Sequence, residues 1–184
     1  EPIGRDFAPF IFELVPRTEA YDICCWVHSK KGLYDSNFGG WRDYLLRNLL
    51  GSPQNVAAIL DAFAADERLG LVYPVPFHAV AGKVEWGSNY QLCRELLGRL
   101  RISVDDREPP RFPTSAMFWF RTKALEPLTR LGLTMEDFER HADGTRDPKT
   151  NAVIDGTISH ALERTIIYIA EAAGYAAREV LFER

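Results

Sequence analysis

The sequence predicts an α/β fold in which helices flank a mainly parallel sheet. Short apolar runs alternate along the chain with longer amphipathic segments, as expected when each strand is followed by a helix. The 184 residues allow one domain with a sizeable core, and two full domains would be crowded. We therefore expect residues 1–184 to form a single domain. Because the chain starts without methionine, we also expect it to be either a fragment of a larger protein or a processed chain.

The predicted strands are short apolar runs bounded by polar residues or prolines. Residues 116–121 (AMFWFR) would place Met117, Trp119 and Arg121 on one face and Ala116, Phe118 and Phe120 on the other. The expected strands are Asp22–Val27, Leu69–Tyr73, Ala116–Arg121 and an edge strand at Glu179–Phe182.

The predicted helices begin at capping residues and end at glycines or polar loops. Ser52-Pro53 gives a cap and a first-turn proline, and Ser88-x-x-Gln91 reads as a capping box. Thr157 would cap the longest helix. The expected helices are Phe7–Leu14, Trp41–Leu50, Pro53 to about Asp66, Ser88 to about Leu100, Lys123–Leu131, Met135–Arg140 and Thr157 to about Ala173.

Composition excludes several classes of protein. The chain has 46% hydrophobic and 26% charged residues and a formal charge of −4, without the basic footprint of a nucleic-acid-binding protein. It contains no apolar run long enough for a transmembrane segment and no secretory signal pattern. Cys24, Cys25 and Cys93 lack the spacing of metal ligands, which favours buried, reduced thiols and a cytoplasmic location.

The segment His28-Ser29-Lys30 follows the first predicted strand and is the first candidate site. Ligands of parallel α/β sheets bind beyond the carboxyl ends of the strands, so these side chains are well placed to contact one. Histidine and lysine make charge-assisted hydrogen bonds to diphosphate oxygens. The spacing alone favours a solvated basic turn over a binding site.

Two further motifs allow a functional and a structural reading. In Gly4-Arg5-Asp6, glycine permits close approach of a ligand and arginine binds phosphate, whereas Asp6 is more commonly a helix cap. Trp86 and Asn89, in the motif WGSN, suit stacking on a sugar and hydrogen bonding to it. A helix start with a packing tryptophan explains that motif almost as well.

The segment DGTISHALER, residues 155–164, carries the candidate catalytic carboxylates. Asp155 precedes a predicted helix N-terminus, and a carboxylate beside a cleft can act as a general base on an acceptor hydroxyl. His160 and Arg164 share a helix face, with Glu163 alongside. Helix-terminus chemistry and surface pairing are the structural alternative. The sequence lacks zinc spacing, a Walker loop, a nucleophile elbow, a Rossmann fingerprint and Asp-x-Asp.

Taken in order, seven segments resemble the rhamnan synthesis protein F family of bacterial polysaccharide glycosyltransferases. They cover essentially the whole chain, and each is modest alone, whereas their shared order is specific. The segments are GRDFAPF, YDICCWVHSKK, WRDYLLRNLLGS, GLVYP, WGSN, FPTSAMFWFR and DGTISHALER followed by EAAGY.

The resemblance implies a divergent GT-A-like glycosyltransferase. Its expected activity is transfer of a sugar, typically rhamnose, from a nucleotide-sugar donor to a growing cell-surface polysaccharide such as rhamnan or lipopolysaccharide O-antigen. The acceptor would be a lipid-linked glycan at the inner face of the cell membrane, with other polysaccharide-assembly enzymes as partners. The alternative is a non-catalytic glycan- or nucleotide-binding module, and a third reading is a domain that docks partner enzymes.

The same resemblance implies roles for the candidate residues. Gly4, Arg5 and Asp6 would lie near the nucleotide, and His28, Ser29 and Lys30 would replace the metal-binding Asp-x-Asp of related enzymes. We therefore expect no metal and no other cofactor. Asp155 is the expected base, Glu163 the second choice and Glu136 a distant third. Trp86, Asn89 and His160 would line the sugar or acceptor side.

The sequence departs from the family pattern in three places. Ser115 stands where the family pattern leads us to expect glycine, and residues 141–154 are longer and more polar than expected. A GT-A fold also starts with a strand-helix-strand unit that would precede this chain. The chain is therefore expected to be an incomplete catalytic domain, a part of a larger enzyme or a degenerate relative.

Overall fold

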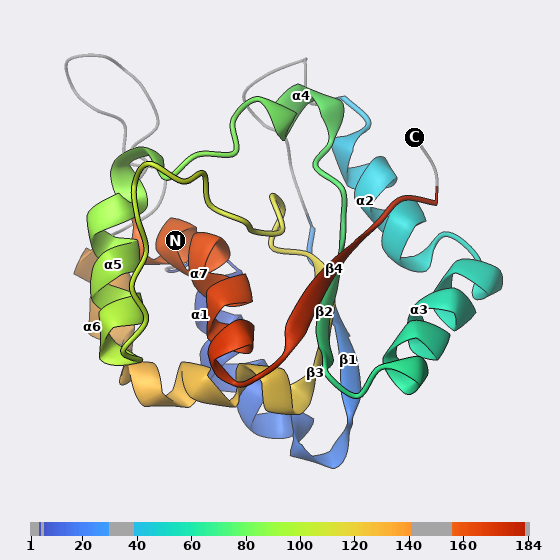
Figure 1. The fold of residues 1–184 in the computed structure, drawn as a ribbon, viewed down its shortest axis with the longest axis horizontal. Helices are drawn as coiled ribbons and strands as arrows, with labels where there is room; N and C mark the ends of the chain where they lie inside the picture. Colours follow the sequence, from blue (N-terminus) through green and yellow to red (C-terminus); the bar gives the residue numbers. More distant parts are fainter. Residues whose placement is uncertain (1–3, 5, 30–38, 141–155, 183–184) are drawn as a thin grey trace.

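The computed structural model describes residues 4, 6–29, 39–140 and 156–182. Helices cover both faces of a central sheet, so the predicted α/β class is confirmed (Figure 1). The elements are α1 (Phe7–Pro9), the π-helical η1 (Phe10–Leu14), the 3₁₀-helical η2 (Val15–Ala20), β1 (Ile23–Trp26), α2 (Trp41–Leu50), α3 (Pro53–Ala65), β2 (Leu69–Pro74), α4 (His78–Ala81), η4 (Gly87–Asn89), α5 (Tyr90–Arg99), β3 (Phe118–Arg121), the 3₁₀-helical η5 (Thr122–Leu131), α6 (Met135–Arg140), α7 (Ile158–Ala172) and β4 (Ala176–Val180).

The strands of the described residues are ordered β1-β3-β2-β4 in one mixed sheet. Strand β3 is antiparallel to both β1 and β2, and β4 is parallel to β2. The prediction of a mainly parallel sheet is therefore wrong. After α5 the chain returns along the helical layer to the level at which β2 ended, so β3 enters the sheet in the opposite direction (Figure 1).

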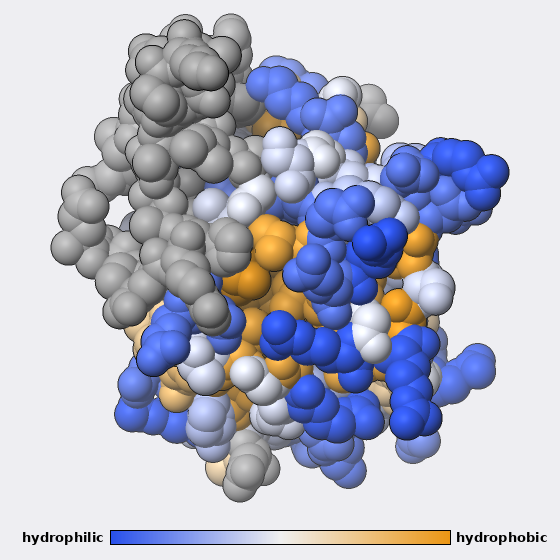
Figure 2. All heavy atoms as spheres, turned by 90° about the vertical axis from the view of Figure 1, so that its left-hand side faces the viewer, coloured by the Kyte–Doolittle hydropathy of each residue, from blue (hydrophilic) through white to orange (hydrophobic). Residues whose placement is uncertain are grey.

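The core is divided between the two faces of the sheet. Helices α2 and α3 cover one face, and α1, α5 and α7 cover the other (Figure 1). Phe118 and Phe120 pack on the α5/α7 side with the fully buried Phe10, whereas Met117 and Trp119 face α2 and α3. This alternation along β3 is the one that the sequence predicted. Figure 2 shows the α5 side, where apolar residues gather near the centre among hydrophilic ones.

Two predicted side-chain helix caps are confirmed and two are wrong. The Ser52 hydroxyl accepts a hydrogen bond from the Asn55 amide, and the Thr157 hydroxyl accepts one from the His160 amide. Ser88 does not cap α5: Asn89 occupies the N-cap position, with helical backbone angles and no side-chain capping bond. Asp6 occupies the N-cap position of α1 but likewise makes no capping bond.

Candidate functional site

His28 lies at the carboxyl end of β1, where its ring is held by two acceptors. Its Nε2 is 2.9 Å from the Ser115 carbonyl oxygen and 3.1 Å from Oδ2 of Asp6. Because both partners accept, Nε2 carries the hydrogen, and Nδ1 faces no hydrogen-bond partner within the described residues. The side chains of His28 and Asp6 are only 19% and 18% exposed. Their orientation is therefore fixed by the fold.

Asp6 owes its position to this pairing. Its carboxylate bonds a histidine 22 residues further along the chain, which explains why it leaves the α1 cap unmade. Ser115 lies in the turn before β3, is 1% exposed, and accepts a bond from the Met117 amide through its hydroxyl. The sequence could not show that the Ser115 carbonyl would reach His28.

Gly4 is buried in the packing between the N-terminal segment and two helices. Its φ is +75°, and a Cβ added there would lie 2.5 Å from the Ala8 Cβ and 2.6 Å from Cδ1 of Phe138. Its carbonyl accepts a hydrogen bond from the Ser159 hydroxyl at 3.1 Å, near the start of α7. Gly4 thus joins the Asp6 segment to that helix terminus.

The N-termini of α5 and α7 lie side by side at the same edge. A Cβ on Gly156 would lie 3.3 Å from the Ser88 carbonyl oxygen, and Cys93 donates from Sγ to the Ala161 carbonyl at 3.7 Å. These two contacts show that the helices run parallel, which Figure 1 also shows. Aligned helix N-termini present amide donors and partial positive charge, which favour anions.

His160 and Glu163 occupy the first turns of α7, and both are partly exposed. The His160 Nδ1 lies 2.8 Å from the Thr157 hydroxyl, so the cap residue orients this ring as well. Ser29 is exposed directly beyond His28. Arg5, Lys30 and Asp155 lie outside the described residues.

Trp86 and Asn89 are both more buried than the sequence interpretation assumed. Trp86 is 6% exposed, donates from Nε1 to the Glu108 carbonyl at 2.7 Å, and packs between Tyr90 and Tyr168. Asn89 is 0% exposed, and neither Oδ1 nor Nδ2 has a hydrogen-bond partner in the described structure. Buried amides in native proteins are normally paired, with water or a ligand where no protein group is in reach.

Metal binding finds no support in the described part of the chain. Within it, no group of three or more histidine, cysteine, aspartate or glutamate side chains is arranged to hold a metal ion. Among the same residues, no helix combines the length and the hydrophobicity needed to cross a membrane.

The resemblance seen in the sequence is matched by comparison with known proteins. The model of the family described as "Rhamnan synthesis protein F" matches residues 1–175. The chain belongs to the rhamnan synthesis protein F family. This membership connects it with the synthesis of rhamnan or a related polysaccharide.

Two curated relatives come from two strains of Xanthomonas campestris pv. campestris, and both are called "Uncharacterized protein WxcX". Each is 32% identical to this chain over 165 residues, which is 89% of the chain and 22% of the relative. The chain therefore spans about a fifth of the length of these relatives. No solved structure matches it.

Proposed function

We propose that this chain is a glycosyltransferase domain with a divergent GT-A-like fold. It moves rhamnose from a nucleotide-sugar donor to a growing cell-surface polysaccharide of the rhamnan or O-antigen type. Family membership supports the polysaccharide context. The observation that carries the proposal is the fixed Asp6–His28 pair. Asp6 is close in sequence to Gly4, whose carbonyl is hydrogen-bonded at the start of α7, and α5 begins beside that point.

The donor diphosphate would bind at this edge without a metal ion. Protonated His28 keeps Nε2–H on Asp6 and Ser115 and offers Nδ1–H to a phosphate oxygen. Because the Asp6 carboxylate offsets much of that positive charge, the attraction for the anion comes mainly from the helix N-termini, Arg5 and Lys30. His28 then acts chiefly through orientation, as a preorganised donor to the leaving diphosphate.

The carboxylate that activates the acceptor is proposed from its place in the sequence. Asp155 stands two residues before the Thr157 cap of α7, and Glu163 on α7 is the second choice. The acceptor would be a lipid-linked glycan at the cytoplasmic face of the membrane, where other assembly enzymes act on the same polymer. Asp155→Ala should abolish transfer and leave donor affinity nearly intact.

A transfer assay with nucleotide-rhamnose donors, run with and without a chelator, tests the proposal. Replacing His28 by glutamine should lower turnover about 10²-fold, as expected when one oriented donor to a developing charge is lost. His78→Gln is the matched control, because His78 is exposed on α4. Turnover should persist with the chelator. Strict dependence on manganese or magnesium would refute metal-free binding of the donor diphosphate. Unchanged turnover in the His28 variant would refute the role proposed for His28.

A non-catalytic module is the second candidate, because the chain spans only 22% of its curated relatives. A binding module within a larger assembly protein would have such a size. This chain should then bind a nucleotide sugar or glycan and show neither sugar transfer nor donor hydrolysis, even if a longer protein that contains it has both activities.

A further inference from the structure

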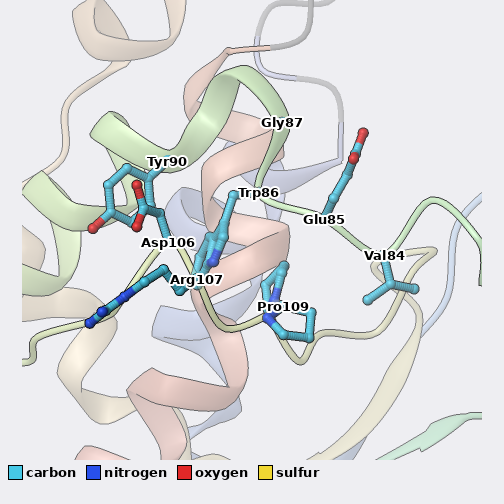
Figure 3. A pocket seen from close by; sticks show the side chains of 9 residues that line it. Val84, Glu85, Trp86, Gly87, Tyr90, Asp106, Arg107 and Pro109 are labelled. Carbon is cyan, nitrogen blue, oxygen red and sulfur yellow. The ribbon is translucent and has the colours of Figure 1, made fainter.

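A pocket of ≈ 480 Å³ lies just before the N-terminus of α5, apart from the Asp6–His28 pair (Figure 3). This volume is within the range of about 300–1,000 Å³ usual for small-molecule sites. One wall comes from the connector between α4 and α5 and the other from the segment that follows α5. The lining residues are Val84, Glu85, Trp86, Gly87, Tyr90, Asp106, Arg107, Pro109 and Pro110.

The walls of this pocket are fixed to each other and to α7. Trp86 donates to the Glu108 carbonyl at 2.7 Å, and the Tyr90 hydroxyl donates to the Val104 carbonyl at 3.2 Å. On the other side, Nε of the buried Arg164 donates to the Glu85 carbonyl at 2.9 Å. The two aromatic residues thus bind the 104–108 segment, so the pocket exists before any ligand arrives, which lowers the cost of binding.

The chemistry of the lining suits a neutral sugar better than an anion. Two carboxylates line the pocket, and the guanidinium of Arg107 is already paired with Asp105. The two carboxylates belong to Glu85 and Asp106, and in Figure 3 the Glu85 side chain extends away from Tyr90. Carboxylates repel phosphate and accept hydrogen bonds from sugar hydroxyls.

The remaining lining is apolar and fits the less polar parts of a deoxy sugar. Pro109, Pro110 and Val84 offer surfaces for a methyl group or for ring C–H groups. Trp86 is only 6% exposed and offers a ligand little of its ring, and the partly exposed Tyr90 adds a second aromatic surface. A 6-deoxyhexose combines hydroxyls with such a methyl group.

The pocket also adjoins the edge where we place the donor. It includes Gly87, and the next residue, Ser88, contacts Gly156 at the start of α7. We propose that this pocket binds one 6-deoxyhexose unit of a neutral glycan, the acceptor of the transfer. Naming it the acceptor site rests on the proposed function, whereas the binding of the glycan does not.

Titration of the labelled protein with a methyl rhamnoside disaccharide, followed by amide NMR, tests this assignment. Signals of the pocket residues, with Gly87 and Arg107 as reporters, should shift. Asp106→Asn removes the charge from an exposed side chain and should weaken binding about ten-fold. Asp61→Asn, the same change at an exposed position on α3, should have no effect. Inorganic pyrophosphate, the anionic probe, should leave the signals of Asp106 and Arg107, on the wall away from α5, unchanged.

Each outcome decides one of the two proposals. Disaccharide shifts confined to the pocket and weakened in Asp106→Asn support the glycan site, even in a protein that never turns over a donor. Turnover without such shifts leaves the proposed function standing and overturns the pocket. Absence of binding, equal affinity of the two variants, or preferred binding of pyrophosphate in the pocket also overturns it.

Discussion

Replacing Gly4 by alanine probes the junction between the N-terminal segment, α6 and α7. The new Cβ would lie 2.5 Å from Ala8 and 2.6 Å from Phe138, and the backbone at φ +75° is unfavourable for alanine. The backbone contributes about 1–2 kcal/mol and the overpacking about 1–3 kcal/mol. The free energy of unfolding should therefore fall by about 2–5 kcal/mol, with a loss in Tm on the order of 10 °C.

Substitutions at two other glycines separate the backbone contribution from the overpacking contribution. Gly132 has φ +61° and no atom within 4 Å of an added Cβ, so Gly132→Ala should cost only the backbone part, about 1 kcal/mol. Gly98 lies in α5 with open space and no positive φ, so Gly98→Ala should stabilise by about 0.5–1 kcal/mol.

Urea and thermal unfolding of the three variants provide the measurement. From most to least stable, the order should be Gly98→Ala, wild type, Gly132→Ala and Gly4→Ala. A Gly4→Ala protein as stable as the wild type would refute the packing argument. If such a protein bound the donor more weakly, Gly4 would instead belong at the ligand.

Two further predictions concern stability. Arg121 donates from Nη2 to the Phe63 carbonyl at 2.8 Å. Arg121→Met should therefore lower the free energy of unfolding, measured with urea, by about 2–3 kcal/mol. Arg130→Met, at an exposed position, should change it little. Burial raises the pKa of Cys25 from 9.0 to about 12, and burial, with Glu179 nearby, raises that of Tyr73 from 10.0 to about 12. The unfolded chain loses these protons first, so their contribution is intact below pH 9 and is lost as the pH rises toward 12. Urea midpoints that stay constant over that range would contradict this prediction.

Local signals in the sequence predicted the elements well. Ser52-Pro53 and Thr157 determine helix starts through contacts within one turn, and α2 spans the predicted Trp41–Leu50. The last strand begins at Ala176 rather than Glu179, because its limits depend on pairing with β2. The Ser88 capping box failed because Asn89 takes the cap position in a helical conformation.

The site was predictable only in part, since its contacts are long-range. The position of His28 at a strand end follows from the apolar run before it, and the sequence indicated it. Its partner Asp6 was expected more often as a helix cap, because aspartate before a helix usually serves that purpose. The pocket wall at Asp106 carried no motif, although WGSN pointed to the opposite wall at Trp86.

The wrong strand direction and the missed partner of His28 have one cause. In a parallel sheet the amino end of β3 would lie at the edge opposite to the carboxyl end of β1. Because β3 is antiparallel to β1, Trp26 pairs with Phe118, and the turn before β3 meets the residues that follow β1. That geometry brings the Ser115 carbonyl to Nε2 of His28 and fixes the hydrogen on that nitrogen. The antiparallel direction of β3 is therefore what gives the histidine at the end of β1 a fixed orientation.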